Sequence, residues 1–293
     1  MEFYGKKIIR IDKDSSEYPG QLKNIPNPPK QLYCCGNTEL LYKDSVGVVG
    51  SRKFTIYGKG VAIMLGNTLA KAGIVVVSGL ANGIDSFSHQ GMLESGGMGI
   101  GVLGSGINKM GPKKNFNLML DILKNDGLIV SEYEPDFPGN PTTFPQRNRI
   151  ISGLSKKVVV VEANFNSGAL ITAQCANEQG REVYAIPGNI NSQFSMGSNL
   201  LIRDGAIPLI IFDDIIKDLG INPPNRVMPS AECGEDEMKV VNALMKENGS
   251  SVDKISKNIN KMVGETSAIL TIMEIKGIVE SSAGKYYLHQ NII

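Results

Sequence analysis

Three segments of the chain combine serine and glycine in a way that suits the binding of phosphate. They are Gly50-Ser51-Arg52, Ser78-Gly79 and Ser167-Gly168. Glycine lets the backbone approach a ligand, and exposed N–H groups with a serine hydroxyl can surround an anion. Arg52 can also clamp a phosphate with two parallel hydrogen bonds. Taken alone, the first segment fits a strand-to-helix turn with a surface arginine equally well.

The segment from Phe144 to Leu154 has the most unusual composition in the chain. The protein has seven arginines among its 30 basic residues, and Arg147 and Arg149 lie here on either side of Asn148. Arginine suits phosphate forks and stacking on bases, and Phe144, followed by a proline, could stack on a base. The alternative interpretation is a helix start with solvated charges.

Two ionisable residues follow the second serine–glycine segment. Asp85 stands where it could cap the next helix, and His89 comes one turn later. We interpret His89 as a structural residue rather than a catalytic one.

The motifs of common enzymes and metal sites are missing from the sequence. There is no P-loop, no nucleophile elbow and no dinucleotide fingerprint after the first apolar run. The four cysteines form no C-x-x-C pair, and the chain has 2 histidines, which argues against a zinc site and a disulfide scaffold. We therefore predict no catalytic residue, no metal and no cofactor.

The overall charge does not indicate a nucleic-acid-binding protein, since the net charge is +1. A phosphate site would have to be local. The content of 42% hydrophobic and 20% charged residues is that of an ordinary globular protein. No run of about 18 apolar residues and no signal peptide is present, so we expect a reduced, cytosolic protein that does not bind membranes.

Short apolar runs alternate with segments of helical periodicity between residues 45 and 216. This pattern predicts an α/β domain with a parallel sheet covered on both faces, whose ligands bind beyond the carboxyl ends of the strands. Several serine–glycine loops at that one end favour a row of phosphates over one small molecule. Residues 1–44 are turn-rich and are expected to be an irregular extension on the core. The predicted strands are 46–50, 74–77, 98–103, 127–131, 157–161 and 182–186.

The C-terminal part of the chain is predicted to form a second domain. Residues 217–236 are polar and proline-rich and indicate a linker. Residues 237–293 suggest a small winged helix, with three helices and a hairpin. Residues 235–293 contain 8 acidic residues, 7 lysines and no arginine, which argues against duplex binding. We favour contact with a partner or support of a dimer.

The motifs together resemble the DprA/Smf family of DNA-processing proteins. The resemblance runs from Tyr18-Pro19 to Gly205-Ala206, and the 237–293 domain resembles that family's winged helix. Its most specific parts are Val-Gly-Ser-Arg at 49–52, Ser-Gly-Leu-Ala-x-Gly-Ile-Asp at 78–85 and Phe-Pro-x-Arg-Asn-Arg-x-Ile at 144–151, with Val-Glu-Ala at 161–163 and Ser-Gly-Ala-Leu-x-Thr-Ala at 167–173.

This resemblance implies an extended Rossmann-like fold with a mixed sheet, and a homodimer that binds single-stranded DNA. It also implies a role in natural transformation, in which the protein protects incoming strands and helps load the RecA recombinase. Carried over residue by residue, the DNA contacts fall on Ser51, Arg52, Ser78, Gly79, Phe144, Arg147, Asn148, Arg149, Ser167 and Gly168.

Two departures from the family pattern are expected to reshape or weaken the DNA groove without abolishing it. Gly111-Pro112 stands where many members have Tyr-Pro, and Pro141-Thr142-Thr143 is neutral where some carry a basic residue. The competing function is a Rossmann-like nucleotide hydrolase of the phosphoribohydrolase type, but its Pro-Gly-Gly-x-Gly-Thr-x-x-Glu loop is missing here. A third function, transcription regulation through the winged helix, would require tight duplex binding by residues 235–293.

Overall fold

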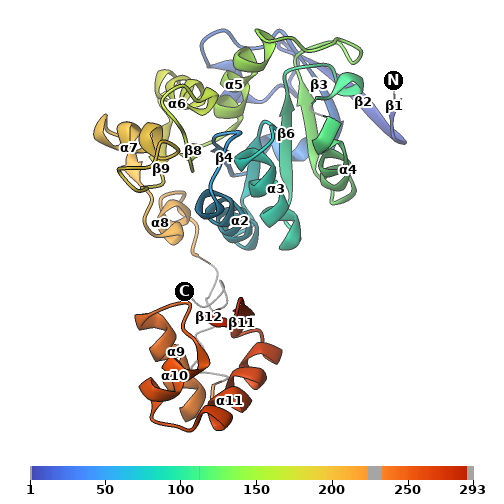
Figure 1. Ribbon diagram of the computed structural model, residues 1–293. Helices are drawn as coiled ribbons and strands as arrows, with labels where there is room; N and C mark the ends of the chain where they lie inside the picture. The colour runs from blue at the N-terminus through green and yellow to red at the C-terminus, as the bar shows by residue number, and fades with distance from the viewer. Residues whose placement is uncertain (1, 112, 224–232, 289–293) are drawn as a thin grey trace. The chain divides into compact units, whose positions relative to one another are not determined.

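The structure is a computed structural model that describes residues 2–111, 113–223 and 233–288. The chain divides into two compact units, Met1–Pro223 and Pro224–Ile293 (Figure 1). The first unit contains a ten-stranded sheet and the second has its own small core.

The sheet of the first unit is parallel over most of its width. Its strand order is β1-β2-β3-β7-β6-β5-β4-β8-β9-β10. The strands from β7 to β10 in this order, which include β6, β5 and β4, run parallel, whereas β1 pairs with β2, β2 with β3 and β3 with β7 in antiparallel fashion. The strands are β1 (Glu2–Phe3), β2 (Lys6–Asp12), β3 (Gln31–Gly36), β4 (Ser45–Val49), β5 (Val75–Ser78), β6 (Gly99–Leu103), β7 (Leu128–Ser131), β8 (Lys157–Val160), β9 (Glu182–Ala185) and β10 (Ile207–Pro208).

The central strands confirm the predicted α/β sheet. Every residue of β4, β5, β6, β7 and β8 is buried, because helices cover both faces and leave no solvated side. That burial is why these strands are continuous apolar runs rather than alternating ones, and why their positions could be predicted.

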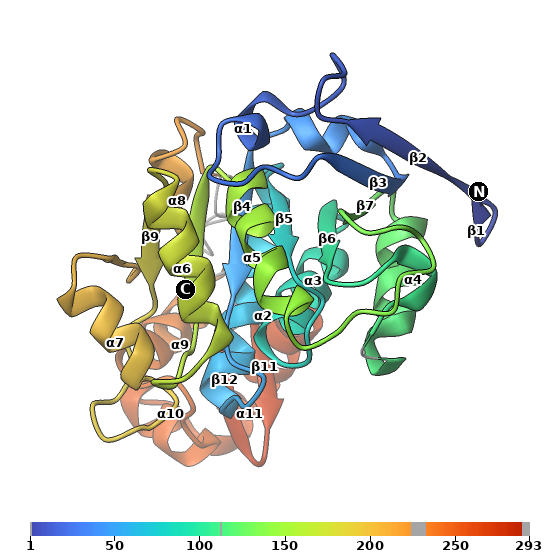
Figure 2. The same ribbon diagram turned by 90° about the horizontal axis from the view of Figure 1, so that it is seen from above.

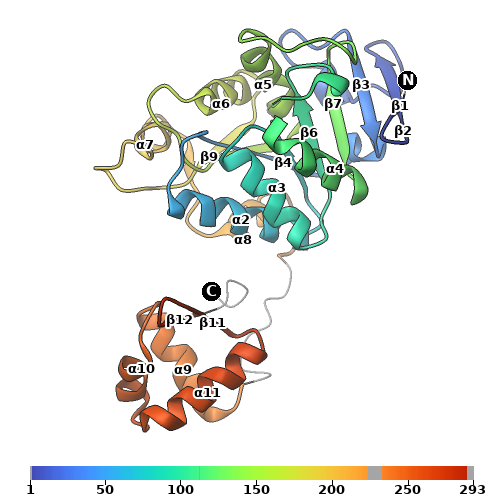
Figure 3. The ribbon, with the colours of Figure 1, turned by 45° about the vertical axis from the view of Figure 1, so that its right-hand side comes forward.

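Two layers of helices enclose the sheet, as Figure 3 shows with α5 and α6 on one face and α2, α3 and α8 on the other. The helices are α1 (Gly20–Lys23), α2 (Ile56–Lys71), α3 (Ile84–Glu94), α4 (Phe116–Lys124), α5 (Thr143–Leu154), α6 (Gly168–Glu178), α7 (Met196–Arg203) and α8 (Phe212–Lys217), with 3-10 turns η1 (Thr38–Tyr42), η2 (Ile107–Lys109) and η3 (Lys113–Asn115).

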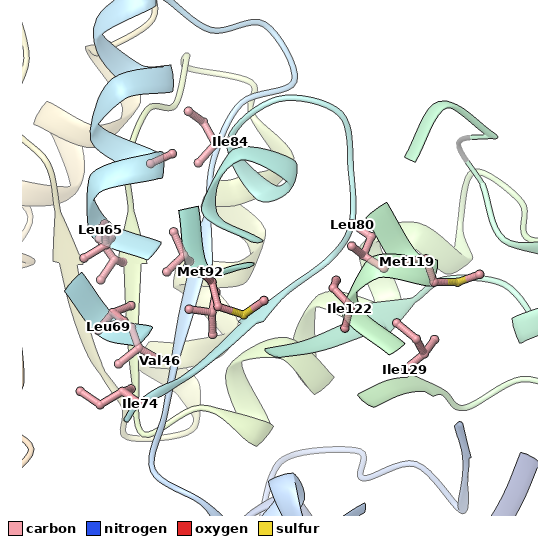
Figure 4. Close-up of a cluster of buried hydrophobic side chains, with 14 of the residues drawn as sticks. Val46, Leu65, Leu69, Ile74, Leu80, Ile84, Met92, Met119, Ile122 and Ile129 are labelled. Carbon is pink, nitrogen blue, oxygen red and sulfur yellow. The ribbon is translucent and has the colours of Figure 1, made fainter. Parts of the chain in front are cut away.

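One core layer fixes α2, α3 and α4 against the sheet. Figure 4 shows Leu65 of α2, Met92 of α3 and Ile122 of α4 in this layer, all but completely buried. Packed apolar contacts of this kind hold the helix starts at fixed places relative to the strand ends. The loops between β4 and α2, and between β5 and α3, are therefore set by the core rather than by their own sequence.

The expectation that residues 1–44 are irregular is wrong. They contribute β1, β2 and β3, and β3 pairs with β7 at the margin of the parallel sheet. The sequence Lys-Lys-Ile-Ile-Arg-Ile-Asp of β2 alternates poorly, because much of this outer strand is exposed. Its backbone hydrogen bonds to β3 decide its conformation, and periodicity carries no signal of them.

The second unit has the three helices and the hairpin expected of a winged helix. These are α9 (Glu235–Lys246), α10 (Val252–Ile259), α11 (Val263–Ile275), β11 (Val279–Ser282) and β12 (Lys285–Leu288). Helix α9 begins inside the segment predicted as the linker. Residues 224–232 of that predicted linker lie outside the described residues.

Candidate functional site

The carboxyl ends of β4 and β8 open into a pocket of about 600 Å³. It lies between the loop after β4, the start of α5 and the start of α6, and Figure 2 shows these two helices in front of the strands. The lining consists of Val49, Gly50, Ser51, Arg52, Lys53, Ala81, Asp85, Pro141, Phe144, Pro145, Arg147, Asn148, Ile151, Asn164, Asn166, Ser167, Gly168, Ala169, Ile171 and Thr172.

Backbone hydrogen bonds fix the loop after β4 while the side chain of Arg52 stays unbound. The Ser51 N–H donates to the carbonyl of Glu162 at 2.7 Å, and the Ser51 carbonyl accepts from Ile84 N at 3.3 Å. Gly83, with φ of +94°, allows this approach, since a Cβ there would lie 2.4 Å from the Ser51 oxygen. Within the described part of the chain, Arg52 makes no hydrogen bond or salt bridge and is exposed. Its guanidinium is available to a ligand.

Arg147 occupies the floor of the pocket as a buried cation. Only 5% of it is exposed, and its Nη1 donates to the carbonyl of Gly79 at 2.6 Å and to that of Val102. Burial lowers the pKa of Arg147 to about 10, Asp85 opposes that change, and the charge of Arg52 adds to it. Arg147 therefore stays protonated at neutral pH. Two positive groups converge on the pocket, which favours an anionic ligand.

Asp85 balances this buried charge. Its carboxylate accepts from Gly79 N at 3.1 Å and Gly50 N at 3.4 Å. Burial raises the pKa of Asp85, whereas the charge of Arg147 and the backbone donors lower it. The predicted capping role is wrong, because Gly83 stands at the N-cap of α3 and the carboxylate joins the loops after β4 and β5 instead.

The first turns of α5 and α6 complete the pocket. The Asn148 amide donates to the carbonyl of Gly168 at 3.1 Å and joins the two helices. Ser167 caps α6 by accepting from Ala169 N, and this helix start adds partial positive charge to the pocket. Phe144 packs against Gly104, where a Cβ would lie 2.7 Å from the ring. The pocket thus combines cations, amide donors and one aromatic ring.

Seven of the ten predicted contact residues line the pocket and three do not. Ser78 is buried and donates to the Val48 carbonyl, and a Cβ on Gly79 would collide with the Arg147 guanidinium at 2.5 Å. Arg149 forms a two-pronged salt bridge with Glu132, at 2.6 and 3.1 Å. Direct DNA contact by these three residues stays a prediction. The seven lining residues are Ser51, Arg52, Phe144, Arg147, Asn148, Ser167 and Gly168.

The start of α5 confirms a helix at the Phe144–Leu154 segment but not its solvated charges. Arg147 is buried and Arg149 is paired, so neither arginine is a freely solvated surface charge. Of the two departures noted in the sequence, Pro141 lines the pocket and Gly111 does not. Pro112 lies outside the described residues.

Sequence reasoning missed several polar residues of the pocket. Lys53, Asn164, Asn166 and Thr172 line it, and the signal for Lys53 was its place directly after Arg52. Glu162 belongs to the Val-Glu-Ala motif, but its role was not predicted: its buried carboxylate accepts from Thr55 N at 2.9 Å and from Thr55 Oγ1 at 2.6 Å. This contact fixes the start of α2. Across the described ranges, no group of three or more His, Cys, Asp or Glu could hold a metal ion, and no helix could span a membrane.

The fold and the pocket define a Rossmann-like α/β protein with a candidate ligand site at the carboxyl ends of its strands. Comparison with known sequences narrows this class. The family model described as DNA recombination-mediator protein A matches residues 9–220. The chain therefore belongs to this family, the DprA/Smf family of recombination mediators.

Relatives cover most of the chain. It is 36% identical to protein Smf of Escherichia coli over 94% of this chain and 76% of that one. The X-ray structure of DNA processing protein A from Streptococcus pneumoniae has a TM-score of 0.68 and 38% identity, covering 72% of this chain and 74% of that chain. DNA processing protein A from Helicobacter pylori, described for its single-stranded DNA binding mode, has a TM-score of 0.63 and 32% identity, covering 69% and 92%.

Proposed function

We propose that this protein is a non-catalytic mediator that binds and protects single-stranded DNA in the strand-end pocket and helps to load the RecA recombinase during natural transformation. The observation that carries the DNA site is the exposed Arg52 beside the buried cation Arg147. Phe144 and the start of α6 add a ring and N–H donors to these charges. The relative from Helicobacter pylori, described as a single-strand binder, supports the same ligand.

The ten residues carried over from the family pattern are proposed to form the DNA site, in three different roles. Six of them, with Arg52 foremost, are proposed to act directly from the pocket lining. Arg147 is proposed to act mainly by its charge, because its Nη1 is committed to two carbonyls. Ser78, Gly79 and Arg149 are proposed to act through the shape of the strand ends. The cytosol, where RecA and incoming strands would meet this protein, is its proposed compartment.

Replacing Arg52 by alanine is expected to weaken binding of a single strand without affecting folding. One phosphate contact fewer should reduce the slope of log K against log salt by about 0.7, since each neutralised phosphate of a single strand contributes about that much. Fluorescence anisotropy of a labelled strand of about 20 nucleotides over a salt series measures this slope.

The matched control is Arg10→Ala, because Arg10 is an exposed arginine on β2 that is paired with Asp12. Its slope should equal that of the wild type. An Arg52→Ala variant with unchanged slope and affinity would contradict the pocket as the DNA site. Equal affinity of the wild type for a duplex would contradict single-strand preference.

A homodimer is proposed to form at the β10 edge of the sheet. Strand β10 pairs only with β9 among the described strands, and Ile207, Ile210 and Ile211 at this edge are 38%, 76% and 51% exposed. An apolar row beside an unpaired strand edge is typical of a surface covered by a partner.

Ile210→Asp is expected to convert the dimer to a monomer, because dimerisation would bury the introduced carboxylate without a partner. Light scattering after size-exclusion chromatography measures the mass. Tyr4→Asp is the control, since Tyr4 is 69% exposed at the opposite edge of the sheet. A dimer that survives Ile210→Asp would place the interface elsewhere.

A further inference from the structure

An exposed aromatic and basic surface adjoins the pocket at the first turns of α2 and α3. We call it the aromatic shelf and define it as Phe54, Lys59 and Phe87. Phe54 is 39% exposed, and its ring meets Phe87 edge-on at a centroid distance of 4.7 Å. The Lys59 ammonium lies 5.2 Å from the centre of the Phe87 ring.

The shelf is fixed in place by the buried network beneath it. Thr55, next to Phe54, donates from its N–H and its hydroxyl to the carboxylate of Glu162. Gly58 leaves room for that carboxylate, since a Cβ there would lie 2.1 Å from it. Phe87 is partly buried and packs against the core. A rigid, partly exposed ring can bind a flat ligand at a low entropic cost.

The charges around the shelf are positive and unbalanced. Arg52, Lys53 and Lys59 are exposed, and in the part of the chain that the structure describes none of them forms a salt bridge. Asp85 and Glu162, the two acidic residues whose carboxylates bond the loops beside the shelf, are buried and accept hydrogen bonds internally. A polyanion at this surface would meet three cations and no exposed carboxylate from the segment 52–59.

The shelf begins at the residue that directly follows the pocket lining. Arg52 and Lys53 line the pocket, and Phe54 is the next residue. The start of α3 is attached to the same loop, because Ile84 N donates to the Ser51 carbonyl. A strand held at Arg52 and Lys53 would therefore lie beside Phe54, the next residue of the same loop.

We propose that the aromatic shelf is a second subsite for single-stranded DNA, where a base stacks on Phe54 while Lys53 and Lys59 hold the flanking phosphates. This inference rests on the proposed DNA site in the pocket and extends it by at least one nucleotide. Stacking is tolerant of sequence because every base has a flat face. It also selects single strands, since the bases of a duplex are already stacked on one another.

The absence of tryptophan from the chain allows a direct test. A Phe54→Trp variant carries one tryptophan, whose emission falls when a base stacks on it. A DNA strand of about 20 nucleotides should quench this emission, and a strand of about four nucleotides, which fills only the pocket, should not. Tyr42→Trp is the control, because Tyr42 is exposed directly before β4, at the opposite end of that strand from the pocket. Its emission should not change with either strand.

A binding measurement complements the fluorescence. Phe54→Ala should lower the affinity for the strand of about 20 nucleotides by about fivefold or more, and leave the affinity for the strand of about four nucleotides unchanged. Abasic residues next to the pocket-bound nucleotides should reduce wild-type affinity similarly and have no further effect on Phe54→Ala.

The outcomes separate the shelf from the pocket. If both strands bind and Arg52→Ala weakens them, but Phe54→Trp is not quenched and Phe54→Ala binds like the wild type, the shelf inference is wrong and the pocket function stands. In that case the exposed shelf would be interpreted as a contact surface for a protein partner instead of DNA. If the wild type binds neither strand, the proposed function fails and the shelf inference fails with it.

Discussion

Arg147→Met is expected to lower the free energy of unfolding by about 3–5 kcal/mol, because it removes two buried hydrogen bonds and the positive charge that favours the ionised, buried Asp85 carboxylate. The guanidinium of Arg147 donates to the carbonyl of Gly79, directly after β5, and to that of Val102, one residue before the end of β6. Both carbonyls would lose a buried donor. Denaturation in urea, followed by circular dichroism, measures the change.

The companion variants make this result specific. Asp85→Asn alone removes the opposite charge but keeps an acceptor for Gly79 N. In the double variant Arg147→Met/Asp85→Asn neither charge is left unpaired, so the two changes should be less than additive, by about 1–3 kcal/mol. Arg52→Ala is the control, since Arg52 is exposed and should affect DNA binding alone. Strict additivity would mean that the two charges do not stabilise each other.

His89→Leu is expected to remove a loss of stability at acidic pH. His89 is completely buried, neither ring nitrogen has a hydrogen-bond partner, and burial lowers its pKa from 6.5 to about 3. Below pH 6.5 the unfolded chain takes up a proton that the folded protein cannot accept, so stability falls as the pH falls from 6.5 towards 3. Between pH 7 and pH 5 the histidine should account for about 2 kcal/mol, at about 1.36 kcal/mol per pKa unit.

Comparison of the two proteins isolates this histidine from the other acidic groups. The wild type and His89→Leu share all carboxylates, so the difference between their unfolding free energies should grow by about 2 kcal/mol in favour of His89→Leu between pH 7 and pH 5. At pH 7 leucine should be tolerated, because no hydrogen bond is lost. Parallel pH profiles would show that His89 is protonated, or accessible to water, in the folded protein.

Much of the α/β core was predictable because its strands are buried on both faces. The apolar runs around Val46, Val76 and Val158 lie in β4, β5 and β8, and the loops after them meet at one end of the sheet as expected. Serine and glycine at the strand ends could be recognised locally, because a tight turn or a close approach of the backbone to a ligand requires small residues at that point of the chain. Most of the site could therefore be placed before its geometry was known.

The N-terminal strands and the roles of the polar residues could not be predicted in the same way. Periodicity reports whether a segment has one buried face, but β2 depends on its hydrogen bonds to β3. The sequence likewise cannot separate Arg147, which is buried, from Arg149, which pairs with Glu132. These two arginines are two residues apart on one helix, so they point to different sides of it.

The sequence by itself determined the class of fold, the family motifs and the strand ends at which the candidate site lies, because each depends on a local pattern of residues. Only the tertiary structure decided which cationic side chains are free to bind a ligand and which are bound to other groups of the protein. Arg52 is free because its guanidinium forms no hydrogen bond or salt bridge with the described part of the chain, whereas Arg147 is held by carbonyls 68 and 45 residues away in sequence. The tertiary structure likewise decided that the exposed ring of Phe54 lies against Phe87, since Phe87 belongs to α3 and Phe54 comes just before α2. Such non-local contacts depend on the packing of the whole core, and no short stretch of sequence encodes them.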